Sequence, residues 1–483
     1  MTPSTGRLAL RRLRWALLIA AFLGCTQATL PPAARDVSSA RVEAFIDSLQ
    51  QRTFAYFWET TNAQNGMAPD RWPNPPFASI AAIGFALTAY PIGTERGWVT
   101  RADAATRTLT TLQFLWRLPQ GTAATGLAGD RGFFYHFLDM DTGLRYRNTE
   151  LSSIDTALLL AGVLVSQQYF DRAEPREVAI RAYADSLYRR VEWTYFLRDL
   201  RPLITMAWRP ERGFGPHAYR GYDEAMILYV LALGSPTHPV EVDAWRAFTS
   251  TYEWADFQGF AHVNFAPLFG HQYSHVFIDF RGIQDEYMRG RGIDYFENSR
   301  RATLAQRQYA IANPGGWTDY GADIWGLTAS DGPTDTTIVI GGISRRFRTY
   351  WARGAAAPYI NDDGTIAPTA AGGSIPFAPE VTGRALVTMR ERYGGDLYAR
   401  YGFLDAFNAT LQDTTVRLRR GRIVQGKGWF DDNYLGIDQG PIVAMIENHR
   451  TALVWDLMKR NPYIVRGLCR AGFTGGWIQG RCN

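Results

Sequence analysis

The chain has 483 residues, and its 46% hydrophobic content is that of a globular protein with a large core. Its 51 Lys and Arg residues exceed its 46 Asp and Glu residues, but four of the arginines precede Cys25, where there is no acid. The rest of the chain is therefore nearly neutral, which argues against nucleic acid as a partner.

The first 28 residues predict an export signal. Basic residues come first, and an uncharged apolar run at 15–24 follows them. This run is too short to span a bilayer but has the length of a signal-peptide core. Two cleavage sites stay open, one before Cys25, which would then carry a lipid, and one after Ala28. We expect a periplasmic protein whose only membrane contact would be a lipid on Cys25, as in an outer-membrane lipoprotein.

The cysteine count agrees with export. Once Cys25 is cleaved off or lipidated, only Cys469 and Cys482 are left, close together near the C-terminus. An even pair in an oxidising compartment predicts a disulfide that fixes the tail. Two unpaired thiols are the alternative.

The remaining chain predicts helices. Apolar residues recur at spacings of three and four in ten segments. In chain order these are 42–60, 80–90, 101–116, 152–169, 175–196, 222–233, 240–254, 285–312, 379–393 and 439–458. The best strand signal is 337–341, and long loops rich in Gly, Pro and aromatic residues span 257–282, 313–333 and 355–380.

These elements favour one all-α domain over residues 40–483, because no linker or change in composition divides them. Many apolar helices joined by long aromatic loops indicate a double-layered helical barrel with the loops forming a cleft at one end. Long ordered loops in a compact domain tend to be functional, so we expect the site among them.

Glu224 is the first candidate acid. It follows Asp223 at the expected start of an apolar helix, where it would lie on the first turn. Apolar surroundings raise the pKa of a carboxyl group, as a general acid needs, whereas a helix N-terminus lowers it. A glutamate that only stabilises the helix start is the alternative.

Asp155 and Glu150 form a second acidic group. Ser152 and Asp155 match a capping box, in which the acid satisfies a backbone N–H, and Glu150 precedes them in a loop where it could meet a ligand. Further along the chain, Asp405 lies among aromatic residues, and Asp438 and Glu447 accompany another loop-to-helix transition. Several acids facing one cleft would supply the acid and base of glycoside cleavage.

The histidines have three interpretations. His271, His275 and Asp279 are spaced by four residues and could bind a metal on a helix, but Gly270 and the nearby aromatic residues favour a loop. Hydrogen bonding to sugar hydroxyls and core packing are the alternatives that we weigh above a metal. The run Asp362-Asp363-Gly364 fits a turn better than a calcium site. The sequence has no phosphate-binding glycine loop, nucleophile elbow or dinucleotide fingerprint.

At these residues the chain resembles the glycoamylase-like domain proteins, which include the endo-β-1,2-glucanases of glycoside hydrolase family 144. The similar motifs include HQYSHVFIDFR at 271–281 and DIWGLTASDGP at 323–333. Others lie at 132–139, 152–162, 364–380, 401–408 and 436–448, in one order along residues 45–460.

The resemblance implies an (α/α)6 barrel, no metal and no organic cofactor. It also implies hydrolysis within β-1,2-glucan to short oligosaccharides, usually with inversion. Glu224 becomes the expected general acid, because a Glu opening this helix is the acid in similar enzymes. The expected base is Asp405 ahead of Asp155, acting directly or through a relay.

Further residues are expected to bind the sugar. Tyr135, Trp208, Trp317 and Trp325 could stack on pyranose faces, with core packing as the alternative for each. Polar contacts are expected from Glu150, His136, Gln272, Tyr273, His275, Asp331 and Asp438. We expect a monomer. The competing functions are an exo-acting or transglycosylating β-1,2-glucan enzyme and a non-catalytic glycan-binding lipoprotein.

Overall fold

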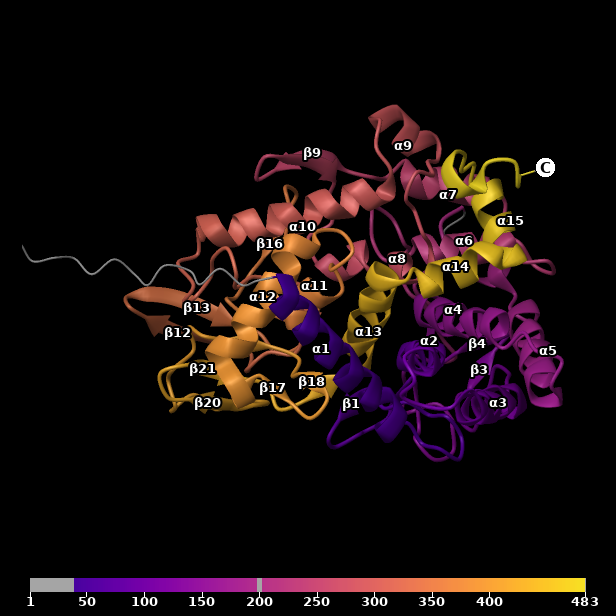
Figure 1. Ribbon diagram of the computed structural model, residues 1–483, viewed down its shortest axis with the longest axis horizontal. Helices are drawn as coiled ribbons and strands as arrows, with labels where there is room; N and C mark the ends of the chain where they lie inside the picture. The colour runs from indigo at the N-terminus through magenta and orange to yellow at the C-terminus, as the bar shows by residue number, and fades with distance from the viewer. Residues whose placement is uncertain (1–38, 198–201, 483) are drawn as a thin grey trace, which may run out of the picture. The chain divides into compact units, whose positions relative to one another are not determined.

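The computed structural model describes residues 39–197 and 202–482, which belong to one compact unit (Figure 1). The export signal expected at 1–28, with Cys25, lies outside the described residues. In the described part, helices dominate and short hairpins connect them. The expectation of a mainly helical protein is therefore confirmed. None of the described helices is both long enough and apolar enough to cross a membrane.

The described α-helices are α1 (Ser39–Thr60), α2 (Ile80–Glu95), α3 (Arg101–Arg117), α4 (Ser153–Tyr169), α5 (Pro175–Arg189), α6 (Met226–Gly234), α7 (Asp243–Thr249), α8 (Tyr273–Phe277), α9 (Glu286–Arg291), α10 (Tyr295–Ala312), α11 (Pro368–Gly372), α12 (Pro379–Tyr393), α13 (Gly436–Arg450), α14 (Leu453–Arg460) and α15 (Pro462–Arg470). Short 3-10 helices lie at Trp193–Leu197, Leu268–His271, Gly394–Asp396 and Gly476–Ile478.

The described strands are β1 (Arg71–Trp72), β2 (Ala78–Ser79), β3 (Gly129–Asp130), β4 (Phe133–Phe134), β5 (Phe137–Leu138), β6 (Leu151–Ser152), β7 (Ala207–Arg209), β8 (Gly213–Phe214), β9 (Trp254–Phe257), β10 (Phe260–Val263), β11 (Ala329–Ser330), β12 (Thr336–Ile340), β13 (Ile343–Phe347), β14 (Trp351–Ala352), β15 (Gly354–Ala355), β16 (Ile360–Asn361), β17 (Tyr398–Ala399), β18 (Gly402–Phe403), β19 (Phe407–Asn408), β20 (Arg422–Val424), β21 (Gly428–Phe430) and β22 (Tyr434–Leu435). They pair antiparallel in sheets of two or three strands. The expected strand at 337–341 is confirmed as β12.

Five helices form the centre of the fold. α2 packs against α4, α4 against α6, α6 against α8, α8 against α13, and α13 against α2. Three members of this set, α2, α4 and α6, are apolar on nearly all sides, as buried helices are. Glycines allow α2 and α4 to approach closely: a Cβ on Gly84 would lie 2.3 Å from the carbonyl oxygen of Leu158. On the outside, α1 packs against α13, α3 against α5, and α15 against α6.

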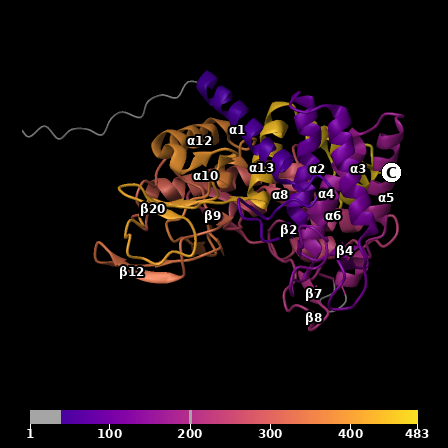
Figure 2. The ribbon, with the colours of Figure 1, turned by 90° about the horizontal axis from the view of Figure 1, so that it is seen from below.

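The central helices all begin at the same end of the unit. β2, β6 and β22 lead directly into α2, α4 and α13, and the Leu268–His271 turn leads into α8. In Figure 2 the strands β2, β4, β7 and β8 lie together below these helices. The residues that precede the central helices are thereby gathered in one region.

Several expected helix limits are wrong. The segment 285–312 is two helices, because α9 ends at Gly292 in the left-handed region, and Asp294 caps the start of α10. The segment 439–458 is also two helices, since Ala452 has a φ of 61° between α13 and α14. The expected helix at 222–233 begins only at Met226, so Glu224 lies in the turn before it.

Candidate active site

A cavity of about 310 Å³ lies at the N-terminal ends of α4, α6, α8 and α13. It is lined by His136, Glu150, Ser152, Ile154, Asp155, Leu158, Met206, Ala207, Tyr219, Glu224, Phe269, Tyr273, Ala329, Tyr350 and Ile437. Three of these residues are carboxylic acids. A larger cavity of about 630 Å³ lies by α7, α9 and α15, but its buried acid, Asp285, is already bonded to Trp245 and Tyr295. The smaller cavity is therefore the candidate active site.

Glu224 reaches this cavity from the turn before α6. Its backbone carbonyl accepts a hydrogen bond of 2.8 Å from Ser274 Oγ, which ties the turn to α8. Within the described residues no side chain forms a hydrogen bond with its carboxyl group. Burial, with the neighbouring Asp155 adding to its effect, raises the pKa of Glu224 to about 7. Apolar burial and the helix N-terminus were expected to have opposite effects on this pKa. The effect of burial is the larger, so the carboxyl group can hold a proton near neutrality.

A chain of charged side chains lines the wall beside Glu224. His136 Nδ1 lies 2.9 Å from Glu150, and its Nε2 lies 3.5 Å from Asp155. Arg209 on β7 donates to the other oxygen of Glu150 at 2.7 Å. Burial alone would lower the pKa of His136, but Asp155 and Glu150 raise it to about 9. His136 is therefore a cation at neutral pH, placed between two carboxylates.

Asp155 has more than a capping role. Ser152 is the N-cap of α4, and its Oγ accepts from the backbone N–H of Asp155 at 3.2 Å, as the sequence predicts. The carboxylate itself accepts a hydrogen bond of 2.6 Å from Ser152 Oγ, and its other oxygen faces His136. Asp155 also lines the cavity and acts electrostatically on Glu224.

A second group of acids is buried next to the cavity. We call it the acid cluster: Asp70, Asp331, Asp405, Asp431 and Asp438. Arg71 on β1 bonds to Asp331 and Asp70, and Arg420 lies 3.5 Å from Asp331. Asp405 accepts the backbone N–H of Asp331 at 2.7 Å. Two expected site residues, Asp331 and Asp405, are thus in contact with each other.

Asp405 and Asp438, two aspartates of the acid cluster, have raised pKa values. Burial, Asp438 and Asp331 raise the pKa of Asp405 well above its usual value. Burial raises the pKa of Asp438, Asp405 opposes this rise and Asp331 adds to it, and the result is a pKa of about 7. The pair Asp405–Asp438 therefore shares a proton near neutrality, as two adjacent carboxyl groups do.

This proton predicts a pH dependence of stability. Between about pH 4, where a free aspartate titrates, and about pH 7, Asp438 keeps a proton that the unfolded chain has released. The unfolded state then binds fewer protons than the folded state. The contribution of Asp438 to the free energy of unfolding therefore falls as pH rises through this window. We expect Asp438→Asn to flatten the pH dependence of the urea midpoint between pH 4 and 7. Asp413→Asn, at an exposed turn, should keep the wild-type slope. Equal slopes for wild type and Asp438→Asn would contradict the assignment.

Oxygen atoms of Asp331, Asp405 and Asp431 lie within 4.8 Å of one another, a spacing that could hold a metal ion. Arg71 and Arg420 already approach Asp331, however, and the N–H of Asp331 occupies one oxygen of Asp405. Guanidinium groups so close oppose a cation, and we assign no metal here. His271, His275 and Asp279 do not converge either, since they contact Phe265, Ser299 and Arg281 respectively.

Tyr350 is a cavity residue that the sequence did not reveal. It lies between the short strands β13 and β14, where no periodic pattern marks it. Its side chain is 52% exposed and lines the cavity. Partial burial raises the pKa of Tyr350 above the usual value, and Asp438 and Asp405 raise it further, so the phenol is neutral. Tyr273, which was expected, lines the same cavity from α8.

Several residues that were expected to contact the sugar are buried in packing contacts and do not line the cavity, and their sugar contacts stay predictions. These residues are Tyr135, Trp317, Trp325, Gln272 and His275. For example, Gln272 donates to the carbonyl of Ala370 at 2.9 Å and to Ser374 at 2.8 Å. Trp208 on β7 is partly exposed and packs against Tyr195, and its sugar contact stays a prediction. Cys469 and Cys482 form a disulfide near the C-terminus.

Comparison with known families identifies the class of this protein. The Glycoamylase family, described as "Putative glucoamylase", matches residues 216–462. A crystal structure from Bacteroides uniformis ATCC 8492 with the same glucoamylase description is 32% identical to the chain. That match covers 92% of this chain and 100% of the other, with a TM-score of 0.76. The chain belongs to the Glycoamylase family, and the resemblance found from its motifs is confirmed.

Two relatives have more specific descriptions. An endo-β-1,2-glucanase from Chitinophaga pinensis, solved with sophorotriose and glucose, is 27% identical; the match covers 90% of this chain and 99% of that one, with a TM-score of 0.76. An exo β-1,2-glucooligosaccharide sophorohydrolase (non-reducing end) of Parabacteroides distasonis is 28% identical over 461 residues. This match covers 88% of the chain, which spans only 57% of that relative.

Proposed function

We propose that this protein is an exported glycoside hydrolase that cleaves β-1,2-glucan within the chain, with inversion, on an (α/α)6 barrel. One observation carries the assignment of chemistry: the carboxyl group of Glu224, whose pKa is raised to about 7, lines a cavity beside a chain of charged side chains. The substrate is supported by the β-1,2-glucan activities of the two relatives. The ring of central helices supports the barrel. The export signal predicted at 1–28 supports periplasmic location, with or without a lipid on Cys25.

In this proposal Glu224 gives its proton to the leaving glycosidic oxygen. Asp155, next to the His136 cation, helps to keep Glu224 protonated by raising its pKa. The base is the pair Asp405–Asp438, whose shared proton titrates near neutrality. Since neither of these two acids lines the cavity, the proton of the attacking water reaches them through a relay of hydroxyl groups or water.

The mode of cleavage has a second candidate. The Parabacteroides distasonis relative is an exo-acting sophorohydrolase, which favours release of sophorose from chain ends. An endo-acting enzyme forms a broad range of product lengths from the first minutes, whereas an exo-acting enzyme forms one disaccharide throughout.

Product analysis tests the proposal. Purified protein is incubated with linear β-1,2-glucan, and with starch and a β-1,3-glucan as control polysaccharides, and the products are separated by chromatography over time. We expect a mixture of short oligosaccharides from β-1,2-glucan alone. Cleavage of starch, or none of β-1,2-glucan, would contradict the substrate assignment, and binding of β-1,2-glucan without products would favour a non-catalytic binding protein.

A further inference from the structure

Tyr350 lies at one end of a short ladder between β11 and β14. In this antiparallel pair Ser330 is opposite Trp351. Tyr350 directly precedes Trp351, and Asp331 of the acid cluster directly follows Ser330, so both lie just beyond this end of the ladder. The hairpin β12–β13 extends from this same end of the ladder. Tyr350 thus lies where the ladder, the acid cluster and the cavity meet.

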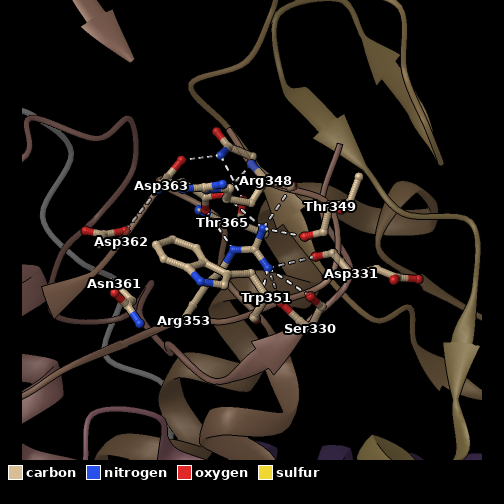
Figure 3. A network of polar contacts seen from close by, with 12 residues as sticks. Ser330, Asp331, Arg348, Thr349, Trp351, Arg353, Asn361, Asp362, Asp363 and Thr365 are labelled. Atoms are coloured by element: carbon tan, nitrogen blue, oxygen red, sulfur yellow. Dashed lines mark hydrogen bonds and ion pairs between the residues drawn. The ribbon is translucent and has the colours of Figure 1, made fainter. Parts of the chain in front are cut away.

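The backbone around Tyr350 is held by one buried ion pair, shown in Figure 3. Arg353 is fully buried, and its guanidinium donates two hydrogen bonds to the carboxylate of Asp363, at 2.7 Å from Nε and 2.9 Å from Nη2. The same guanidinium donates to the carbonyl oxygens of Ser330 at 2.8 Å and of Arg348 and Thr349 at 3.1 Å each. All the nitrogens of Arg353 are used in this way, which binds both strands of the ladder to a single side chain.

Contacts near the Arg353–Asp363 ion pair restrict the residues before Tyr350 further. Asp363 accepts the backbone N–H of Arg348 at 3.0 Å, and Asp335 accepts the hydroxyl of Thr349 at 2.8 Å. At Gly332 an added Cβ would lie 2.2 Å from both the carbonyl of Arg348 and Nη2 of Arg353, so the two strands pack without room for a side chain. The residues directly before Tyr350 are therefore fixed from several sides.

The side chain of Tyr350 has no such packing. Among the large apolar side chains that are exposed in residues 39–197 and 202–482, only Tyr350 lines the cavity of Glu224. An exposed aromatic ring on a fixed backbone loses little conformational freedom when it binds a ligand. Its flat face fits the C–H face of a pyranose, and its neutral hydroxyl can hydrogen-bond to a sugar.

We propose that Tyr350 binds a glucosyl unit of the substrate, and that Arg353 is the positioning residue that holds Tyr350 over the cavity. This inference rests on the proposed function, since it takes a β-1,2-linked gluco-oligosaccharide as the ligand. Tyr350 contacts the sugar, whereas Arg353 acts only through the backbone of Tyr350.

Calorimetric binding of a β-1,2-gluco-oligosaccharide to the Glu224→Gln variant tests the first part. In this background we expect Tyr350→Ala to raise the Kd about tenfold, the size of an aromatic contact of about 1.5 kcal/mol. Tyr350→Phe keeps the ring and should stay within about threefold of the parent. The control is Val339→Ala on the exposed end of β12, which should leave the Kd unchanged. An unchanged Kd for Tyr350→Ala, or an equal loss with Val339→Ala, would overturn the inference.

A double-mutant cycle tests the positioning role. Arg353→Lys keeps the charge but loses the two-pronged grip on Asp363. We expect it to weaken binding when Tyr350 is present and to have no further effect in the Tyr350→Ala background. A merely structural role would weaken binding equally in both backgrounds and would overturn this part. If Arg353→Lys does not fold, Asp363→Asn disrupts the same pair and serves in the same cycle.

The two proposals fail differently. If the substrate class is wrong, neither wild type nor Glu224→Gln binds the oligosaccharide, and the wild type forms no product. If only the inference about Tyr350 is wrong, turnover and binding are intact and the Tyr350 variants bind like their parent.

Discussion

Replacing Glu224 with glutamine should lower kcat by about 10²- to 10⁴-fold, the contribution of a general acid. Glutamine keeps the shape and hydrogen-bonding capacity of the side chain but has no proton to give to the leaving oxygen. The Kd for a β-1,2-gluco-oligosaccharide should change little, because the cavity walls are intact. Initial rates of reducing-end release, with calorimetric binding in parallel, measure both quantities. Glu241→Gln, whose side chain is 85% exposed, should keep wild-type kcat.

The pH dependence of kcat gives a second test of Glu224 as the general acid. Burial, with Asp155 adding to it, raises the pKa of Glu224 to about 7, so the active, protonated form is lost above that pH. We expect kcat to decline on the alkaline side of about pH 7. Asp155→Asn removes the neighbouring charge and should move this decline to lower pH. Full activity of Glu224→Gln, or an unmoved alkaline limb in Asp155→Asn, would contradict the assignment of the acid.

The helical fold could be predicted because its signal is local. α12 begins at Pro379 and ends at Tyr393, the limits that the periodicity predicts. Breaks inside apolar segments were less visible. Gly292 in the left-handed region and the Asp294 cap divide α9 from α10, yet a glycine and an aspartate also occur in uninterrupted helices. The division at Ala452 has no sequence signal, since alanine seldom adopts a positive φ.

The candidate site was predictable only in part. Residues at or just before the starts of apolar helices, such as Asp155 and Glu224, were found because the start of a helix has a sequence signature. The sequence does not show whether an aromatic ring packs inward, and Trp325 and Tyr135, both expected at the sugar, are fully buried. Tyr350 was missed because only long-range packing brings the end of a short ladder to the cavity.

The acid cluster shows the same limit of sequence-based prediction. Its members come from segments far apart in the chain, so the sequence does not reveal that Arg71 has to balance several of them. The side chain of Arg71 is only 11% exposed, and it bonds to Asp331, which is 1% exposed, and to Asp70. Burial alone would lower the pKa of Arg71, but Asp331 and Asp70 raise it above its usual value. Arg71 is thus a permanent cation among buried acids.

We expect Arg71→Met to lower the free energy of unfolding by about 3–5 kcal/mol at pH 8, because it leaves buried carboxylates without their partner. The loss should be smaller at pH 5, where protons can neutralise the acid cluster instead. Urea unfolding at both pH values measures it. The matched control is Arg420→Met: Arg420 approaches the same oxygen of Asp331 at 3.5 Å but is 34% exposed, so its loss should cost about 1 kcal/mol or less.

Removing the charge of Asp331, the partner of Arg71, should restore part of the stability that Arg71→Met loses. Asp331→Asn in the Arg71→Met background leaves an amide where the unpaired carboxylate was, and an amide costs much less to bury than a charge. We therefore expect the double variant to be more stable than Arg71→Met alone at pH 8. If Arg71→Met were no more destabilising than Arg420→Met, the acid cluster would be neutralised by its own protons and not by Arg71. The proton shared by Asp405 and Asp438 would then not depend on this guanidinium, and the proposed base would act independently of β1.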